Sequence, residues 1–238
     1  MRSRVDEFDP RMLFERGMNA SGRLGLAITM CEAIAALLVN GSTLAVGRIT
    51  IDFETMQAGK PPVGFATAAT ASNTPGVWLV ENDPSAPGGG RVLAQKSTDR
   101  TFYRFPLCIY QGLAARDVDV SVKLKPISGK VDQAGGIVVR YRDPDNYYVV
   151  RANALEDNVR FYRVVDGKRT LIAGADLRVA AGEWHGLRIV AKGPHFRVWW
   201  DGHPVFEADD GTFPDAGKVG LWTKADSVTH FDDLVIES

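Results

Sequence analysis

Polar and apolar residues alternate along most of the chain from about Ile49 onward, a period of two that is typical of β-strands. The segment Asp117–Lys125 shows this most clearly, with Val or Leu at every second position and Asp, Ser or Lys between them. A strand of this kind buries one face and leaves the other in water. Because no segment after residue 46 has a convincing helical period, we expect a domain built of strands.

About a dozen such segments follow one another, separated by short turns rich in Gly, Asp, Asn and Pro. The expected strands are 78–81, 92–96, 117–125, 135–142, 147–153, 158–165, 169–173, 184–191, 197–201, 204–207, 218–223 and 230–237. This number and spacing predict an all-β fold in which two antiparallel sheets pack as a jelly-roll sandwich. We place the domain at residues 46–238, with residues 1–45 as an N-terminal extension.

The charge balance narrows the choice of partners. The 238 residues carry a formal net charge of −1, so there is no broad basic field for nucleic acid or an anionic membrane. The two cysteines, Cys31 and Cys108, lie far apart and form no Cys/His cluster with zinc-ligand spacing. We therefore expect no nucleic-acid partner, and interpret Cys108 as a small buried apolar residue.

The N-terminal extension contains one apolar run, LGLAITMCEAIAALLV at 24–39. It is shorter than the roughly 20 residues that a membrane span needs, and it suits the apolar core of a signal peptide better. Small residues at Thr43 and Ala45 favour cleavage after Ala45. We expect export to the periplasm or the extracellular space, with no membrane span in the mature chain. Met18 is an alternative start, and a cytosolic helix packed on the domain is the alternative structure, because Glu32 interrupts the run.

The C-terminal half resembles the concanavalin A-like lectin/glucanase superfamily. The resemblance lies in GEWHGLRIVAKGPHFRVWWDG at 182–202, in GKVGLW at 217–222 and in FDDL at 231–234. Within that superfamily, residues 132–165 look most like the 3-keto-disaccharide hydrolase-like domains, and laminin G-like modules are similar here. The resemblance covers most of 49–238 and implies a jelly roll, but it does not imply one activity, because the superfamily contains lectins, glycosidases and structural modules.

Three functions follow from the resemblance. The first is an exported, noncatalytic sandwich that binds carbohydrate on its concave face. The second is a small hydrolase or lyase acting on a 3-keto-glycoside or a related glycan, and the third is a module that binds proteins. Retaining glucanases of this fold carry paired carboxylates on one strand, about 5–5.5 Å apart. This chain has no Glu-x-Asp-x-x-Glu or similar run, which argues against a glucanase of that type and leaves other glycoside hydrolase-like activity open.

Strand parity selects a candidate sugar-contacting set. Each of the pairs Arg140/Arg142, Arg151/Asn153 and Trp222/Lys224 lies on one face of its expected strand, and Asp132 and Gln133 precede the glycine pair at 135–136. On a shared concave face they would offer hydrogen-bond donors for hydroxyl groups and an indole for a C–H face. The alternative is a set of exposed strand arginines paired with Asp132, Asp157 or Asp226.

One metal site is also expected from relatives. In related sandwiches, carboxylates of the first and last strands hold a structural calcium ion. Here Glu54 opens the domain and Asp232 closes it, and Ca²⁺ takes several oxygen ligands. No other cofactor is expected. The four histidines, His185, His195, His203 and His230, have no metal-like spacing.

Overall fold

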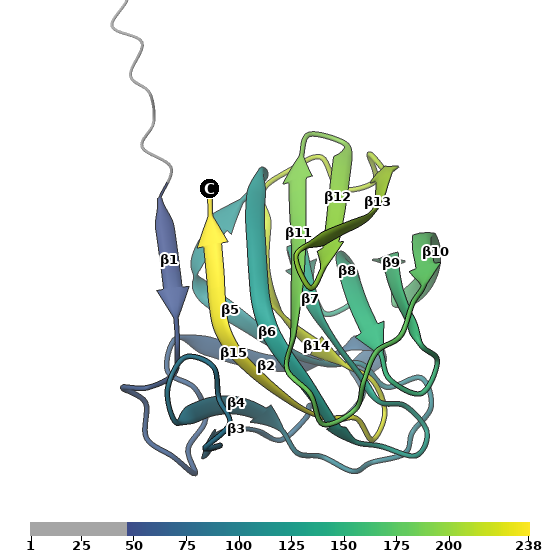
Figure 1. The fold of residues 1–238 in the computed structure, drawn as a ribbon. Coiled ribbons are helices and arrows are strands. Elements are labelled where there is room, and N and C mark those ends of the chain that lie inside the picture. The colour runs from purple at the N-terminus through teal and green to yellow at the C-terminus, as the bar shows by residue number, and fades with distance from the viewer. Residues whose placement is uncertain (1–46) are drawn as a thin grey trace, which may run out of the picture. The chain divides into compact units, whose positions relative to one another are not determined.

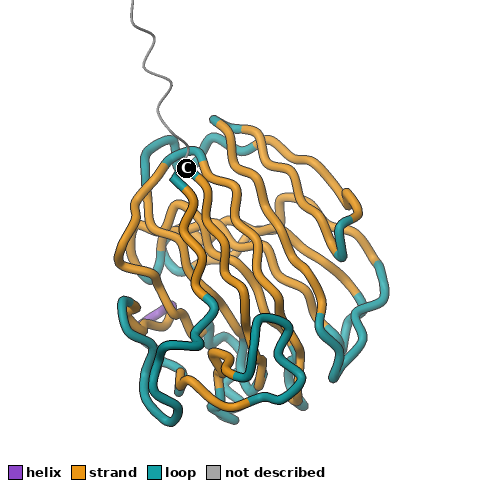
Figure 2. The backbone as a smooth tube through the Cα atoms, turned by 60° about the vertical axis from the view of Figure 1, so that its left-hand side comes forward, coloured by secondary structure: helices purple, strands orange, loops and turns teal. Residues whose placement is uncertain are grey.

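The computed structural model describes residues 47–238, and for Ser72 only the backbone. The expected signal peptide, its cleavage site and Cys31 lie outside the described residues. Within them the chain forms fifteen strands and one short 3₁₀ helix, Thr70–Ser72. The expected all-β class is confirmed, and two layers of strands face each other (Figures 1 and 2).

The first sheet, called sheet A below, has eight strands. Seven follow the order β13-β12-β11-β6-β15-β4-β3, and β1 pairs with β15 at one end. Its strands are β1 (Arg48–Ile51), β3 (Trp78–Asn82), β4 (Arg91–Gln95), β6 (Val118–Ser128), β11 (His185–Lys192), β12 (His195–Trp200), β13 (His203–Asp209) and β15 (Val228–Glu237). The first and last strands of the domain thus lie side by side (Figure 1).

The second sheet, sheet B, has seven strands in the order β10-β9-β8-β7-β14-β5-β2. They are β2 (Phe65–Ala69), β5 (Pro106–Ala115), β7 (Ala134–Asp143), β8 (Asn146–Asn153), β9 (Asn158–Val165), β10 (Lys168–Asp176) and β14 (Gly217–Thr223). All pairings in both sheets are antiparallel. Consecutive strands β7 to β10 form a meander, so residues 134–176 build most of one side of this sheet.

The main hydrophobic core lies between the two sheets and follows the predicted alternation, and a second buried cluster around Phe105 and Trp222 lies on the other face of sheet B. In β6, the residues Val118, Val120, Val122 and Leu124 are all buried in the main core. Trp200 of β12 also enters the core, whereas its neighbour Trp199 lies half-buried on the outer face. Cys108 is buried, and burial raises the pKa of its thiol far above the usual range, as expected for a residue that only fills space.

A β-bulge interrupts the alternation of β7. The register with β8 shifts between Val139 and Asp143, and Arg140 has a positive φ of 50°. A bulge inserts residues without partners and turns the following side chains out of the expected faces. The expected alternation of side chains between the two faces of β7 therefore holds before Arg140 and fails after it.

Candidate functional site

The outer face of sheet B brings several predicted residues together. Trp222 of β14, Gly136 of β7 and Arg151 of β8 form one row across three adjacent strands. The neighbouring row contains Ala134 and Asn153. Gly136 carries no side chain between Trp222 and Arg151, and a Cβ there would approach the carbonyl oxygen of Val150 to 2.3 Å. The predicted common face of Arg151, Asn153 and Trp222 is thus confirmed.

The loop before β7 is held by a single carboxylate. Asp226 accepts hydrogen bonds from the backbone N–H groups of Lys130, Val131 and Asp132, at 2.9, 2.9 and 3.1 Å. Burial alone would raise the pKa of Asp226, but these backbone donors outweigh it and lower the pKa. A Cβ on Gly129 would lie 1.8 Å from the carbonyl oxygen of Asp132, so only glycine permits this turn. The loop therefore presents Asp132 in one fixed position.

Asp132 lies at the centre of the arrangement. Its Oδ1 accepts from Asn153 Nδ2 at 2.8 Å, and its Oδ2 lies 2.5 Å from Lys224 Nζ. All three side chains are buried. Burial raises the pKa of Asp132, and the nearby Lys224 and Arg151 reduce that rise without cancelling it. The result is a rigid, charged pair beneath the surface.

Arg151 connects this pair to the surface. Its guanidinium donates to Asn158 Oδ1, to Glu156 Oε2 at 2.7 Å and to the Tyr162 hydroxyl at 3.2 Å. Arg151 is almost fully buried, whereas 43% of the Glu156 side chain is exposed. Burial raises the pKa of Glu156, but the charge and hydrogen bonds of Arg151 outweigh it, so the pKa is lowered. Glu156 thus offers water an ionised carboxylate held from behind by Arg151. We call Asp132, Arg151, Asn153, Glu156 and Lys224 the polar cluster.

Two apolar side chains border the polar cluster. Phe102 is 66% exposed and lies over Lys224, with Nζ 4.4 Å from the ring centroid, and Leu155 is 51% exposed beside Glu156 in the chain. The buried Arg104 fixes the loop of Phe102, because its guanidinium donates to the carbonyls of Thr74, Pro75 and Ala225. An exposed phenyl ring thus stands beside charged hydrogen-bonding groups.

Trp222 was predicted as an exposed aromatic floor, and this is wrong. Trp222 is fully buried. The guanidinium of Arg169 lies over the rings of Tyr162, Phe105 and Trp222, at 4.3, 4.8 and 5.8 Å from their centroids. Within residues 47–238, no carboxylate lies within 4 Å of the Arg169 guanidinium, and its Nη1 is buried without a hydrogen-bond partner. Trp222 is thus enclosed by the apolar cluster that contains Phe105 and Tyr147, with Arg169 above these rings.

Arg140 and Arg142 do not join the polar cluster. The bulge directs Arg140 into the molecule, where its guanidinium donates to the carbonyls of Arg116, Phe213 and Gly193 at 2.9, 2.9 and 2.5 Å. Arg142 is paired with Asp215 at 2.9 Å on the surface. Gln133 is buried next to Asp132, and its backbone carbonyl accepts a hydrogen bond from the backbone N–H of Ala154. Arg142 is thus an exposed, ion-paired arginine, but its partner is Asp215 and not one of the expected aspartates, and Arg140 is a structural residue.

The carboxylates predicted to hold calcium have backbone partners. Glu54 Oε1 accepts the N–H groups of Gly90 and Arg91 at 2.9 and 2.7 Å, and Asp232 Oδ2 accepts that of Gly88 at 3.0 Å. Burial, together with the nearby Asp233 and Glu54, raises the pKa of Asp232 to about 6. No group of three or more His, Cys, Asp and Glu side chains within 47–238 is arranged to hold a metal ion. Calcium at this loop stays a prediction.

The fold and the polar cluster together define a sandwich of the concanavalin A-like class with a built polar site on one sheet. Residues 112–237 match the 3-keto-alpha-glucoside-1,2-lyase-like domain, and the chain belongs to this family. A 123-residue segment, half of this chain, is 27% identical to levanase of Bacillus subtilis (strain 168), of which it spans 17%.

Solved structures repeat the fold. The carbohydrate-binding module CBM66 from Bacillus subtilis has a TM-score of 0.59 and 21% identity, over 74% of this chain and 96% of that one. Domain 4 of AbnA, an extracellular arabinanase from Geobacillus stearothermophilus in complex with arabinotriose, has a TM-score of 0.53 and 13% identity, over 81% and 93%. At these identities the similarity establishes the jelly roll.

Sequence reasoning missed several residues of the site. Glu156 and Phe102 lie in loops, where strand parity assigns no face. Arg169 lies at the start of β10, where parity places it on a face without showing that its side chain folds back over Trp222. The spacing Arg151, Asn153, Glu156 and Asn158 across one tight turn is a signal that could have pointed to Glu156.

Across the described residues, no helix is long and apolar enough to cross a membrane.

Proposed function

We propose that this domain binds carbohydrate at the polar cluster on the outer face of sheet B. The observation that carries the proposal is the polar cluster itself, in which the buried Arg151 holds the exposed Glu156 carboxylate and the exposed Phe102 ring lies over Lys224. Sugar hydroxyls donate hydrogen bonds, and the exposed Glu156 carboxylate can accept them while Arg151 holds it in its ionised form. A phenyl ring suits the C–H face of a sugar ring because both surfaces are apolar.

The rigidity of the polar cluster supports this proposal. Its buried members hold one another through charged hydrogen bonds, so little side-chain freedom remains to be lost on binding. Among the structural relatives, one is named a carbohydrate-binding module and one holds arabinotriose. Levan and arabinotriose are therefore the first probes that we propose, followed by a wider panel of neutral glycans.

The test is isothermal titration of the protein with these glycans, comparing wild type with Glu156→Ala and Phe102→Ala. We expect at least one glycan to bind, and each variant to weaken binding about tenfold or more, as for residues central to an interface. The matched control is Glu183→Ala, an exposed glutamate away from the site. Absence of binding across the panel, or equal affinity of Glu156→Ala and wild type, would contradict the proposal.

A second candidate function is a lyase acting on a 3-keto-glycoside, which the family match favours. In such a sugar the C3 ketone acidifies the C2 proton. A base takes that proton, the C1–C2 double bond forms, and the C1–O bond breaks to release the aglycone, which gains a proton. Ionised Glu156 is the base that the polar cluster offers, and Arg151 or Lys224 would stabilise the enolate. Arg140 is excluded, because it lies outside the polar cluster and its guanidinium donates to the carbonyls of Arg116, Phe213 and Gly193.

Turnover of a 3-keto-glucoside distinguishes the two candidates. A lyase releases the aglycone and forms an unsaturated ketosugar that absorbs in the ultraviolet, and Glu156→Gln then loses this activity. A binding protein shows no turnover although it still binds the parent glycan. We further propose export of the domain, which the extracellular arabinanase among its fold relatives supports.

A further inference from the structure

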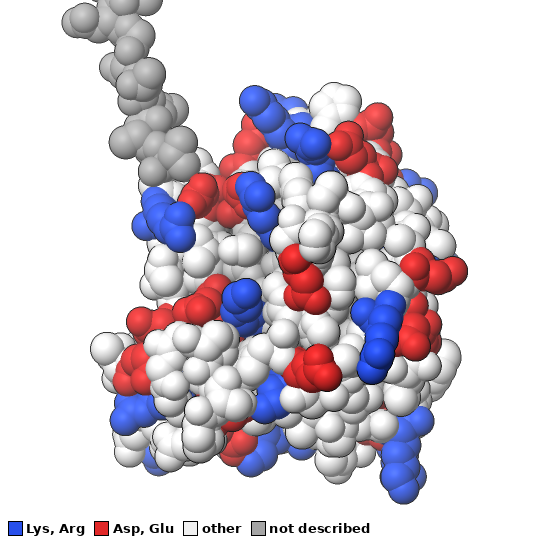
Figure 3. All heavy atoms as spheres, in the orientation of Figure 1, with Lys and Arg blue, Asp and Glu red and all other residues white. Residues whose placement is uncertain are grey.

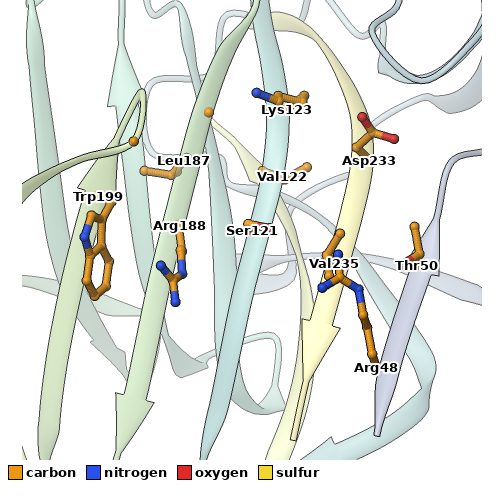
Figure 4. A pocket seen from close by; sticks show the side chains of 12 residues that line it. Arg48, Thr50, Ser121, Val122, Lys123, Leu187, Arg188, Trp199, Asp233 and Val235 are labelled. Atoms are coloured by element: carbon orange, nitrogen blue, oxygen red, sulfur yellow. The ribbon is translucent and has the colours of Figure 1, made fainter.

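A hollow of about 510 Å³ lies on the outer face of sheet A, the sheet that does not carry the polar cluster. It crosses β1, β15, β6, β11 and β12 (Figure 4). A smaller hollow of about 210 Å³ shares Arg48, Ser121, Arg188 and Val235 with it, so the two are continuous. This size lies within the range of roughly 300–1,000 Å³ that is usual for ligand pockets.

Short side chains across the strands create the hollow. One row of directly paired residues runs Thr50, Val235, Ser121, Arg188 and Trp199 from β1 to β12. The first three are short, and Gly186, which pairs with Lys123 in the next row, has no side chain. Long side chains surround this low floor, so the sheet surface is depressed in its middle (Figure 4).

The walls of the hollow differ in chemistry. Trp199 forms one wall, and Arg188 lies beside it with its guanidinium carbon 4.6 Å from the ring centroid. At the opposite side Arg48 reaches from β1 over Val235 (Figure 4). Among residues 47–238, neither Lys123 nor Asp233 has an ion-pair partner within 4 Å. The hollow thus combines an aromatic wall and an apolar floor with a donor and an acceptor that remain available.

The charges of the hollow are balanced. Arg48 is paired with Glu237 at 2.7 Å, and the Nε of Arg188 donates to Asp119 Oδ1 at 2.7 Å. Lys123 and Asp233 contribute one charge of each sign. Figure 3 shows basic and acidic groups side by side on this face of the molecule. A site without net charge gives no advantage to a phosphorylated or sulfated ligand, because nothing offsets the loss of hydration of such an anion.

We propose that this hollow is a second glycan site, which takes a short neutral oligosaccharide. Trp199 and the Val235 floor contact the C–H faces of the sugar rings, Lys123 donates to hydroxyl groups, and Asp233 and Ser121 accept from them. The choice of a glycan as ligand rests on the proposed function, whereas the site itself rests on the hollow. Two sites on opposite sheets allow one molecule to hold two segments of polysaccharide, which raises the apparent affinity for a polymer above that for an oligosaccharide.

The test follows the indole N–H signal of Trp199 by ¹H–¹⁵N NMR while arabinotriose, levan-derived oligosaccharides and the wider panel of neutral glycans are added to the protein. The chain has five tryptophans, and the spectrum of Trp199→Phe assigns the signal. We expect at least one glycan to shift it. Gly186→Leu fills the hollow, and its Cβ would meet Lys123 Nζ at an ordinary 3.6 Å, so the variant is expected to fold.

The variants separate the two sites. Gly186→Leu should abolish the Trp199 shift, whereas Gly211→Leu, a change at an exposed loop glycine with open space around it, should leave it intact. Glu156→Ala should also leave it intact, because Glu156 belongs to the other sheet. The proposal would be overturned if no glycan shifts the Trp199 signal, or if the shift persists in Gly186→Leu. Loss of the glycan-induced shift in Glu156→Ala would overturn it as well. A shift without binding at the polar cluster would support this site while contradicting the proposed function.

Discussion

Two arginines two positions apart have opposite roles in this domain. Arg140 is 1% exposed and donates to three backbone carbonyls that come from different loops. Arg142 is exposed and makes one ion pair with Asp215, and its guanidinium carbon lies 5.0 Å from the ring centroid of Phe213. A surface pair of this kind contributes roughly 0–1 kcal/mol, whereas a buried charge-assisted network contributes several times more.

Arg140→Lys should therefore lower the free energy of unfolding by about 2–4 kcal/mol, because one ammonium cannot reach three diverging carbonyls. Arg142→Lys, the matched control, should change it by less than about 1 kcal/mol. Urea denaturation followed by tryptophan fluorescence measures both. Equal effects of the two substitutions would show that Arg140 is not the structural residue that its contacts indicate.

At the residue scale, sequence reasoning succeeded where strands are regular and failed where they are not. Parity correctly placed Arg151, Asn153 and Trp222 on one face, because β8 and the end of β14 are unbroken there. It misplaced Arg140, because a bulge has no unique sequence signal when no glycine marks it. Trp222 is buried in an apolar cluster with Phe105 and Tyr147, and Arg169 lies over it; these contacts between distant segments are not revealed by the pattern alone.

At the scale of elements, loops determine how the polar groups are presented. The loop after β13 returns the chain from sheet A to sheet B, and Asp210 fastens it. Asp210 Oδ1 accepts from the Tyr148 hydroxyl at 2.6 Å, and Oδ2 accepts from Arg163 Nη1 at 2.6 Å. Burial alone would raise the pKa of Asp210. Hydrogen bonds from Thr212, Tyr148 and Arg163 outweigh this effect and lower the pKa to about 2.

This shift predicts how stability depends on pH. A carboxyl whose pKa is lowered by folding contributes stability above its ordinary pKa near 4, and that contribution is lost as the pH falls towards 2. At pH 7, Asp210→Asn should lower the free energy of unfolding by about 1–2 kcal/mol, and the difference from wild type should shrink between about pH 4 and pH 2.

Asp209→Asn is the control for this prediction, because Asp209 is the neighbouring residue but its side chain is 73% exposed. It should alter stability by less than about 0.5 kcal/mol at either pH. Denaturation curves recorded from pH 2 to pH 7 give both comparisons. A difference between wild type and Asp210→Asn that stays constant or grows as the pH falls would contradict the assigned pKa.

The element pattern itself was largely predictable. Twelve expected segments all correspond to strands of the structure, because most of them are rich in β-branched and aromatic residues and short turns with Gly, Asp, Asn or Pro separate many of them. The three strands that were missed are β1, β2 and β5. Strand β5 begins PLCIY, in which four of five residues are buried on both faces of the strand, so it shows no alternation.

At the scale of the whole molecule, the two sheets present two different surfaces. Sheet B carries the polar cluster, in which buried charges hold Glu156 at the surface. Sheet A carries the hollow bounded by Trp199 and Arg48. The jelly roll explains this division, because each sheet turns one face to the common core and the other away from it, where sheet B adds a second apolar cluster around Trp222 and sheet A forms the hollow. On the two proposals above, the molecule is a scaffold with one sugar site at the polar cluster and a second one on its opposite sheet.

The central claim is that a glycan binds at the polar cluster, and a crystal structure of the protein with the tightest-binding oligosaccharide tests it most directly. We predict a sugar ring against Phe102, with a hydroxyl group within hydrogen-bond distance of the Glu156 carboxylate. A bound sugar elsewhere on the molecule, with no sugar at Glu156 and Phe102, would contradict the account.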